Sequence, residues 1–285
     1  MSNTTEFIIE NGVLVKYVGP GGDVVIPDGV TEIGARSFEG RGYSIRSVTI
    51  PEGVETIGDA AFTCSSIKKL SIPKTVMKIG TGAFAVNEIQ EFPNLEGVSE
   101  IGESVFSSSR FQSVRIPGNI KRILRDAFHN CIHLKELVIE EGTEMIGFCA
   151  FFDCHQLENV YLPESVTVIE EHAFDSCCNL KNFFAPGVNF SSLSGSALKK
   201  VACKYFLSHM DEYTQEDVAA SYRRYLLSQK KKWLPVIFSE DRVDALRVFS
   251  NAGKITAKNI IEEFIKPATE ANAVKCIAFL NQLDV

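Results

Sequence analysis

Cysteine and histidine are the side chains of this sequence whose types and spacing could build a reactive site. Cys131, Cys154 and Cys177 recur every 23 residues, and we place Cys64 at the equivalent position of an earlier segment. Three histidines lie near them in the sequence: His129, His133 and His155. Thiolate and imidazole are the usual zinc ligands, but one residue per repeat forms a line and a tetrahedral ion needs a cluster. We therefore expect buried, reduced thiols that pack a corner, and no metal site.

The sequence gives little support for a catalytic site. The sequence contains no GxSxG, P-loop, HExxH or GxGxxG motif. The paired acids Glu140-Glu141 and Glu170-Glu171 stand in polar turn segments, and His172 has no nucleophile beside it. The sequence therefore predicts no enzyme and no cofactor.

A basic cluster followed by a tryptophan could meet RNA or acidic lipid. It consists of Arg223, Arg224, Lys230, Lys231, Lys232 and Trp233. However, the chain carries 29 basic and 36 acidic residues, a net charge of -7, which argues against nucleic acid as the main partner. We expect the solvated face of an amphipathic helix, or a patch that docks on the acidic remainder of the chain.

The first residues contain no basic segment followed by an apolar run, so nothing indicates a secretory signal. No stretch reaches the roughly 18 apolar residues of a membrane span. The eight cysteines include no CxxC pair, which favours reduced thiols. We therefore expect a cytoplasmic protein without membrane insertion, as a monomer or a weak dimer.

The elements that would position these residues follow from an internal repeat, V-x-x-I-G-x-x-A-F. Its Phe recurs at intervals of 22 to 24 residues, and its Ile stands five residues before the Phe in every copy. The Phe positions are 38, 62, 84, 106, 128, 151 and 174. Units this short must stack and share one core. The repeat explains the excess of Phe, 20 residues against one Trp, as an interior aromatic column.

Each unit also contains an alternating run x-V-x-I that typically ends at Pro, as in Ile50-Pro51 and Ile116-Pro117. Such a run predicts a short strand with one buried face, ended by proline. Eight such strands at about 4.8 Å would give a sheet roughly 35 to 40 Å long. Phe92-Pro93 stands two residues out of step, so the fourth coil is expected to be irregular. The Gly after Ile suits a tight corner or a close backbone approach.

The unit L-x-x-V-x-I-P-x-x-V-x-x-I-G-x-x-A-F-x-x-C resembles the BspA-like leucine-rich repeats over about residues 7–190. The opening residues 7–19 resemble the hairpin cap of that group, and Asn11-Gly12 is itself a type I′ turn signal. The resemblance implies a right-handed solenoid of stacked parallel strands that binds proteins or acts as a surface adhesin, with a surface location, and is not an enzyme.

After residue 195 the apolar residues recur at helical spacing. We expect a hairpin cap over 1–22, a solenoid of about eight coils over 23–195 and an all-α domain over 196–285. Thr214, Ser239 and Thr256 are the expected N-caps of three helices, and Pro267 is expected to end the third. The last 87 residues carry a charge of +3 and the rest -10, and the helical domain is expected to cover the open end of the solenoid.

The strand face is the expected binding surface. The outward positions of successive strands align Val138, Tyr161 and Phe184 in one column, and Arg115 extends it. An apolar column on a polar face marks a contact surface. It could contact a partner protein, or the C-terminal helices themselves could cover it. The sequence thus predicts non-catalytic protein binding through Arg115, Val138, Tyr161 and Phe184, with an adhesin role or a nucleic-acid-binding or regulatory helical domain as alternatives.

Overall fold

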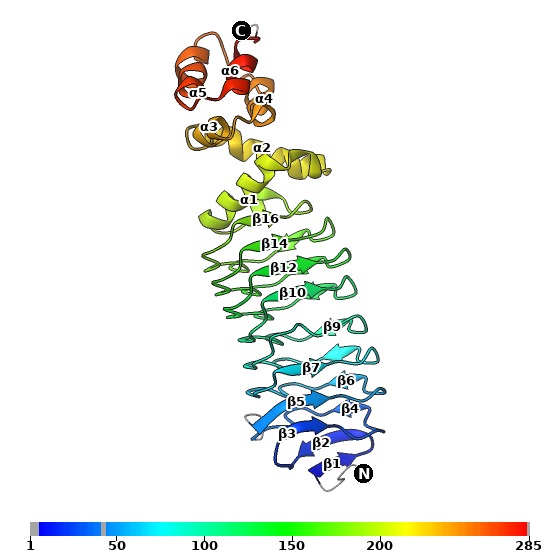
Figure 1. Cartoon of the computed structure of the whole chain (residues 1–285). Helices are drawn as coiled ribbons and strands as arrows, with labels where there is room; N and C mark the ends of the chain where they lie inside the picture. Colours follow the sequence, from blue (N-terminus) through cyan, green and yellow to red (C-terminus); the bar gives the residue numbers. More distant parts are fainter. Residues whose placement is uncertain (1–5, 41–43, 284–285) are drawn as a thin grey trace. The chain divides into compact units, whose positions relative to one another are not determined.

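The computed structural model describes residues 6–40 and 44–283 (Figure 1). The chain divides into two compact units. The first runs through the solenoid to Val188 and takes in Ser192–Tyr205, and the second comprises Asn189–Ser191 and Phe206–Val285. The expected division after residue 195 stays a prediction.

One series of strands forms the long face of the solenoid. Its members pair in parallel in two sheets, β3-β5-β7 and β10-β12-β14-β16. Their bounds are β3 Gly22–Val25, β5 Ile45–Thr49, β7 Lys69–Ser71, β10 Ser113–Ile116, β12 Glu136–Ile139, β14 Asn159–Tyr161 and β16 Asn182–Phe184. The predicted parallel solenoid is confirmed, but residues 91–93 form no strand, so the expected eighth member is missing from the series.

A second parallel ladder of two-residue strands, not predicted from the sequence, lies at the Ile of the repeat. Its members are β4 Glu32–Ile33, β6 Thr56–Ile57, β8 Lys78–Ile79, β9 Glu100–Ile101, β11 Arg122–Ile123, β13 Met145–Ile146 and β15 Val168–Ile169. This ladder is also interrupted, because β9 ends one sheet and β11 begins another.

The aromatic column is present as predicted. The rings of Phe38, Phe62, Phe84, Phe106, Phe128, Phe151 and Phe174 follow one another with centroid distances of 4.5 to 5.6 Å. The backbone N–H of Phe84 donates to the Val105 carbonyl of the next coil at 2.9 Å. Stacked rings and backbone hydrogen bonds on this side therefore join the coils continuously.

The N-terminal hairpin is confirmed within the described residues, although residues 1–5 of the expected cap lie outside them. Strands β1 Phe7–Glu10 and β2 Val13–Tyr17 pair antiparallel. Asn11 and Gly12 both have positive φ, 50° and 82°, as a type I′ turn requires. Strand β2 pairs in parallel with β4, and the Tyr17 ring lies 5.0 Å from that of Phe38. The hairpin therefore extends both the ladder of two-residue strands and the aromatic column.

The repeated Gly serves close backbone approach. A Cβ built at Gly102 would lie 2.3 Å from the backbone N of Thr81, and one at Gly80 would lie 2.6 Å from that of Asp59. Neither glycine has a positive φ. A side chain at these positions would push neighbouring coils apart, which explains why the repeat carries glycine there.

The C-terminal part of the chain is helical as predicted. Its α-helices are α1 Ser196–Ser208, α2 Glu216–Ser228, α3 Lys230–Ser239, α4 Val243–Asn251, α5 Lys266–Glu270 and α6 Val274–Leu280. Short 3-10 helices lie at Phe190–Ser192 and Met210–Glu212, and a π-helix at Ile260–Ile265.

The expected helix caps are wrong in detail. Helix α2 has Gln215 as its N-cap and no side-chain cap hydrogen bond, so Thr214 is one residue too early. Ser239 ends α3 and its hydroxyl donates to the Val236 carbonyl. The π-helix Ile260–Ile265 has Asn259 as its N-cap, so Thr256 is three residues too early. Pro267 does not end the helix, because it lies in the first turn of α5, where a missing N–H is tolerated.

Candidate functional site

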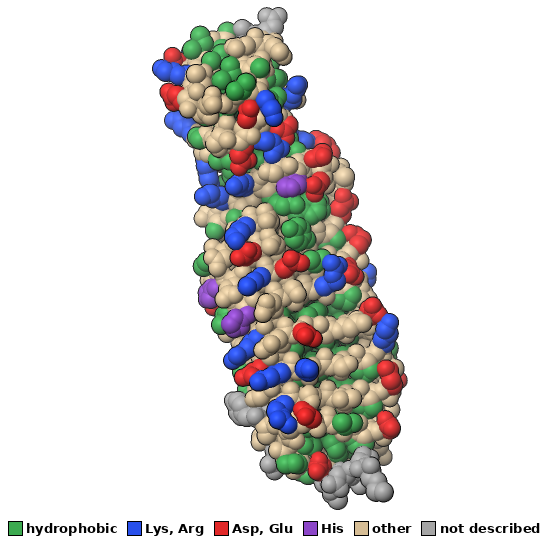
Figure 2. All heavy atoms as spheres, in the orientation of Figure 1, with side chains coloured by type: hydrophobic (Ala, Val, Ile, Leu, Met, Phe, Trp, Pro, Cys, Tyr) green, Lys and Arg blue, Asp and Glu red, His purple; other side chains and the backbone are tan. Residues whose placement is uncertain are grey.

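The expected binding column lies on one sheet in register. Arg115, Val138, Tyr161 and Phe184 are successive Cα partners across β10, β12, β14 and β16. Arg115 is exposed, and the other three are half-buried. Figure 2 shows positive and negative side chains interspersed along the solenoid, with hydrophobic side chains between them. The four side chains therefore lie in line across one parallel sheet, as the spacing of the repeat predicted.

Helix α1 contacts one end of this column. The ring of Tyr205 lies 5.5 Å from that of Phe184, and both belong to the first compact unit. Phe184 thus has a partner within the chain, whereas Val138 and Tyr161 remain half-buried further along the sheet. The expectation that C-terminal residues cover part of the face holds for Phe184.

The irregular fourth coil opens the strand face next to Arg115. Phe92 occupies an inward strand position, and its ring packs 5.2 to 5.9 Å from those of Phe106, Phe111 and Phe128. Phe111 stands where other coils carry Ile or Leu. Two extra rings therefore pack at one level of the core, in the coil where the long ladder is broken between β7 and β10.

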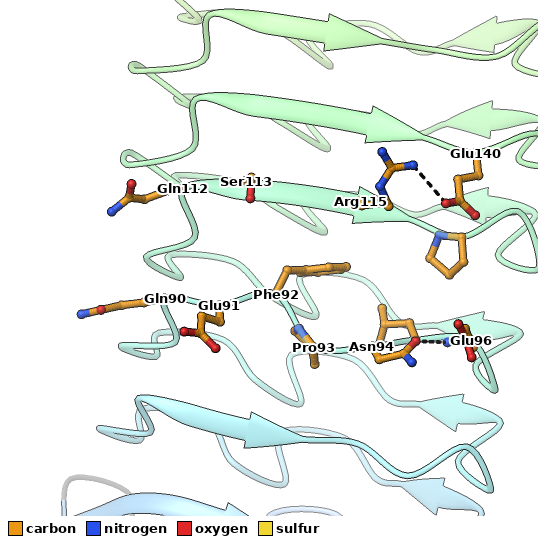
Figure 3. Close-up of a pocket in the computed structure, with 12 residues that line it drawn as sticks. Gln90, Glu91, Phe92, Pro93, Asn94, Glu96, Gln112, Ser113, Arg115 and Glu140 are labelled. Atoms are coloured by element: carbon orange, nitrogen blue, oxygen red, sulfur yellow. Dashed lines mark hydrogen bonds and ion pairs between the residues drawn. The ribbon is translucent and has the colours of Figure 1, made fainter.

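A groove of about 690 Å³ follows this break (Figure 3). Segment 90–96 forms one side and strand β10 the other. Its charged residues are Glu91, Glu96, Glu140 and Arg115. Arg115 donates to Glu140 at 3.1 Å. The sequence indicated the irregular coil but not the hollow, because the loss of strand pairing beside β10 becomes visible only in three dimensions.

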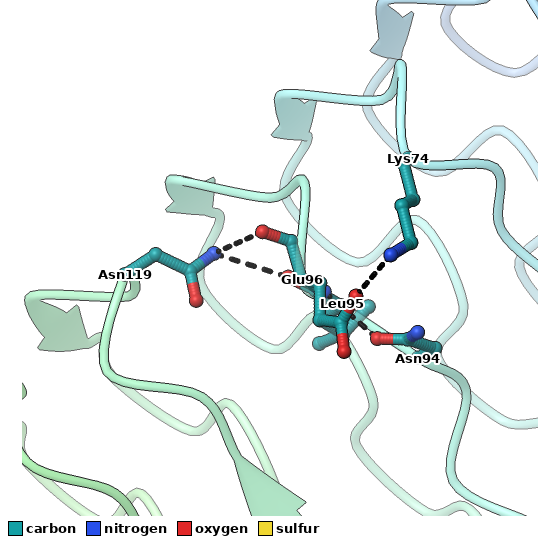
Figure 4. A network of polar contacts seen from close by, with 5 residues as sticks. All are labelled: Lys74, Asn94, Leu95, Glu96 and Asn119. Atoms are coloured by element: carbon teal, nitrogen blue, oxygen red, sulfur yellow. Dashed lines mark hydrogen bonds and ion pairs between the residues drawn. The ribbon is translucent and has the colours of Figure 1, made fainter.

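A network of polar contacts holds the irregular coil in place (Figure 4). The Asn119 side-chain amide donates to the backbone carbonyls of Leu95 and Glu96, both at 3.1 Å, and to that of Val98. Lys74 forms an ion pair with Glu96 at 2.6 Å. Each partner shifts the pKa of the other: the Lys74 pKa is raised and the Glu96 pKa is lowered, chiefly through their hydrogen bond.

The repeated cysteines form a structural column. The thiols of Cys131, Cys154 and Cys177 each donate to the carbonyl of the aromatic-column Phe one coil earlier, at 3.3 to 3.4 Å. Burial raises the pKa of Cys131 to about 12. These thiols therefore stay protonated at neutral pH and satisfy buried carbonyl groups.

The placement of Cys64 in this column is wrong. Ser65, Asn87 and Ser109 are the equivalent residues of the earlier coils, since they follow the column Phe by three positions and Cys64 follows it by two. Asn87 donates to the Phe62 carbonyl at 3.0 Å, as the cysteines do in later coils. Cys64 instead has a φ of 55°, which places it at a left-handed turn position.

Several residues of the basic cluster are buried or paired within the chain. Trp233 is 2% exposed, so its ring offers no stacking surface. Arg223 pairs with Glu216, and Lys230 with Glu263. The basic residues therefore lie on α2 and at the start of α3 with Trp233 buried, and the expected solvated role of this cluster stays a prediction.

The repeat units match a family model, the BspA type leucine rich repeat region, in six copies over residues 22–135 and 121–205. The chain belongs to this family. The resemblance found in the sequence is thereby confirmed, and proteins of this fold are typically not enzymes. No curated protein matches the chain.

The chain is similar to solved leucine-rich repeat structures, one of which supports the fold. A leucine-rich repeat protein from Bacteroides ovatus is 25% identical with a TM-score of 0.56, and the match covers 62% of this chain and 49% of that one. The chain thus spans about half the length of that protein. A leucine rich cell surface protein from Faecalibacterium prausnitzii is 26% identical with a TM-score of 0.35, covering 64% and 62% of the two chains. Among the described residues, no helix has the length and apolarity needed to cross a membrane.

Proposed function

We propose that this leucine-rich repeat chain binds a protein partner through the strand face, at the column Arg115, Val138, Tyr161 and Phe184. The observation that carries the proposal is the register of these side chains, which places one charged and three half-buried apolar or aromatic residues in line on one sheet. Aromatic and Arg side chains are enriched among residues that dominate binding energy. A preorganised sheet loses little entropy on association.

The test is an affinity pull-down with the wild-type chain and a Val138→Ser, Tyr161→Ser double variant. Val25→Ser is the matched control, because Val25 occupies the same outward column on β3 and is 64% exposed. We expect the double variant to recover about tenfold less partner than the wild type, and the control to recover as much as the wild type. Urea denaturation of all three proteins separates lost binding from lost folding. Identical partners for the wild type and a folded double variant would exclude this column.

The location of the chain distinguishes an intracellular binding module from a surface adhesin. Protease treatment of intact cells would digest the chain only if it is displayed outside. Protection until the cells are lysed would exclude the adhesin role.

A further inference from the structure

Two sheet edges face each other across the irregular fourth coil. β7 is the last strand of one sheet and β10 the first of the next. Throughout the described part of the chain, no backbone hydrogen bond joins residues 90–94 to either strand. The edge of a sheet presents a row of N–H and C=O groups that another chain can pair with.

The groove beside β10 has the dimensions of an extended peptide. It runs from Gln112 to Pro117, and a strand advances about 3.3 Å per residue, so a segment of five or six residues fits its length. A second hollow of about 480 Å³ lies between the same coil and β7, and shares Glu91 and Phe92 with the first. Hollows therefore lie on both sides of segment 90–94 on the strand face.

The groove is negatively charged and has an apolar floor. Three glutamates line it against a single arginine. Glu140 already pairs with Arg115, and Glu96 with Lys74. Glu91 has no ion pair among the described residues. It is exposed, beside the ring of Phe92 (Figure 3). A cationic side chain next to an apolar one complements this lining.

We propose that the groove is a strand-acceptor site, in which an extended segment of a partner protein pairs with β10 and places a Lys or Arg on Glu91. Main-chain hydrogen bonds supply affinity in such complexes, and alternate side chains supply specificity. The proposal rests on the proposed protein-binding function and adds to it a contact outside the apolar column. Arg115 borders both surfaces, so one partner can engage them together.

The test uses a phage library of random dodecapeptides, panned on the full chain. We expect the recovered peptides to alternate β-branched or aromatic residues with others and to carry a Lys or Arg. Binding of the best synthetic peptide, measured by fluorescence anisotropy, should weaken about tenfold in Glu91→Lys, the scale of a lost charged hydrogen bond. Glu136→Lys is the matched control, since Glu136 is an exposed strand-face residue of β12 outside the groove.

Amide hydrogen exchange with the bound peptide reports the pairing itself. The amides of β10 should exchange more slowly in the complex than in the free chain. Three results would each overturn the proposal: no enriched peptide, equal binding to Glu91→Lys and the wild type, or unchanged exchange in β10. The Val138→Ser, Tyr161→Ser variant should keep its peptide affinity, so failure of the apolar column and failure of the groove are separately visible.

Discussion

Left-handed residues recur twice in every coil, two positions before and two positions after the column Phe. Arg36, Ala60 and Ser104 are examples of the first kind, with φ of 51° to 54°. Val86 and Ser108 belong to the second, with φ of 57° and 58°. An L-residue in this region costs roughly 1–2 kcal/mol, which glycine avoids and asparagine reduces. The stacking of coils therefore imposes a backbone geometry that these residues do not favour on their own.

Val86 is the position at which this conflict is largest, because a β-branched side chain there is 50% exposed and gains little from burial. We expect Val86→Asn to raise the free energy of unfolding by about 1 kcal/mol. Urea denaturation followed by circular dichroism measures it. Val168→Asn is the control, since Val168 is 45% exposed but lies in β15, where asparagine is disfavoured. Equal effects of the two changes would refute the argument.

Cys131 predicts a pH dependence of stability. Its pKa is raised by burial from 9.0 to about 12, so between these values only the unfolded chain loses the proton. The contribution of this thiol to the free energy of unfolding is complete below about pH 9. It is lost as the pH rises toward 12, by about 1.4 kcal/mol per pH unit. We expect wild-type stability to fall more steeply from pH 9 to 11 than that of Cys131→Ala. Cys178→Ala, at an exposed thiol, should follow the wild type, and parallel profiles for all three would contradict this account.

At the scale of elements, Asn119 replaces the strand pairing that the fourth coil lacks. Removing its amide leaves the part-buried carbonyls of Leu95 and Val98 without this donor. We expect Asn119→Ala to lower the free energy of unfolding by about 1–2 kcal/mol and to speed amide exchange at residues 95–98. Asn179→Ala, at an exposed turn residue, should change neither quantity. Unaltered exchange at 95–98 in Asn119→Ala would show that the aromatic packing alone holds this coil.

The long strands and the aromatic column could be predicted because two anchors, Phe and Ile-Pro, repeat with one period. The second ladder could not, since a two-residue strand such as β8 is too short for an alternating pattern. The out-of-step Phe92-Pro93 indicated where the sheet breaks. The hollow itself could not be predicted, because the sequence does not show that residues 90–96 leave space beside β10. Helix caps failed because Ser and Thr also bond backward to carbonyls, as Ser239 does.

For the whole molecule, the continuous eight-strand sheet expected from the repeat is two blocks joined at one weak interface. The long ladder lacks a strand in the fourth coil, between β7 and β10, and the short ladder breaks between the fourth and fifth coils, from β9 to β11, so neither ladder joins the fourth coil to the fifth. The turn side stays bonded there: Ser104 and Phe106 donate to carbonyls of the next coil at 2.9 Å. Since each coil contacts only its neighbours, stability is a sum of coil and interface contributions. An interface that lacks both ladders contributes least to that sum.

The solenoid should therefore unfold in two steps that divide at this interface. In urea titrations followed by amide hydrogen exchange, we expect the strands up to β9 to share one midpoint and those from β10 to β16 to share another. Trp233 lies in the second compact unit, so its fluorescence follows that unit alone and serves as an internal reference. A single midpoint for both blocks would mean that the Phe column, 5.6 Å from Phe106 to Phe128, couples them as strongly as paired strands do. In that case the groove would be a local feature of the face, with no effect on how the solenoid divides.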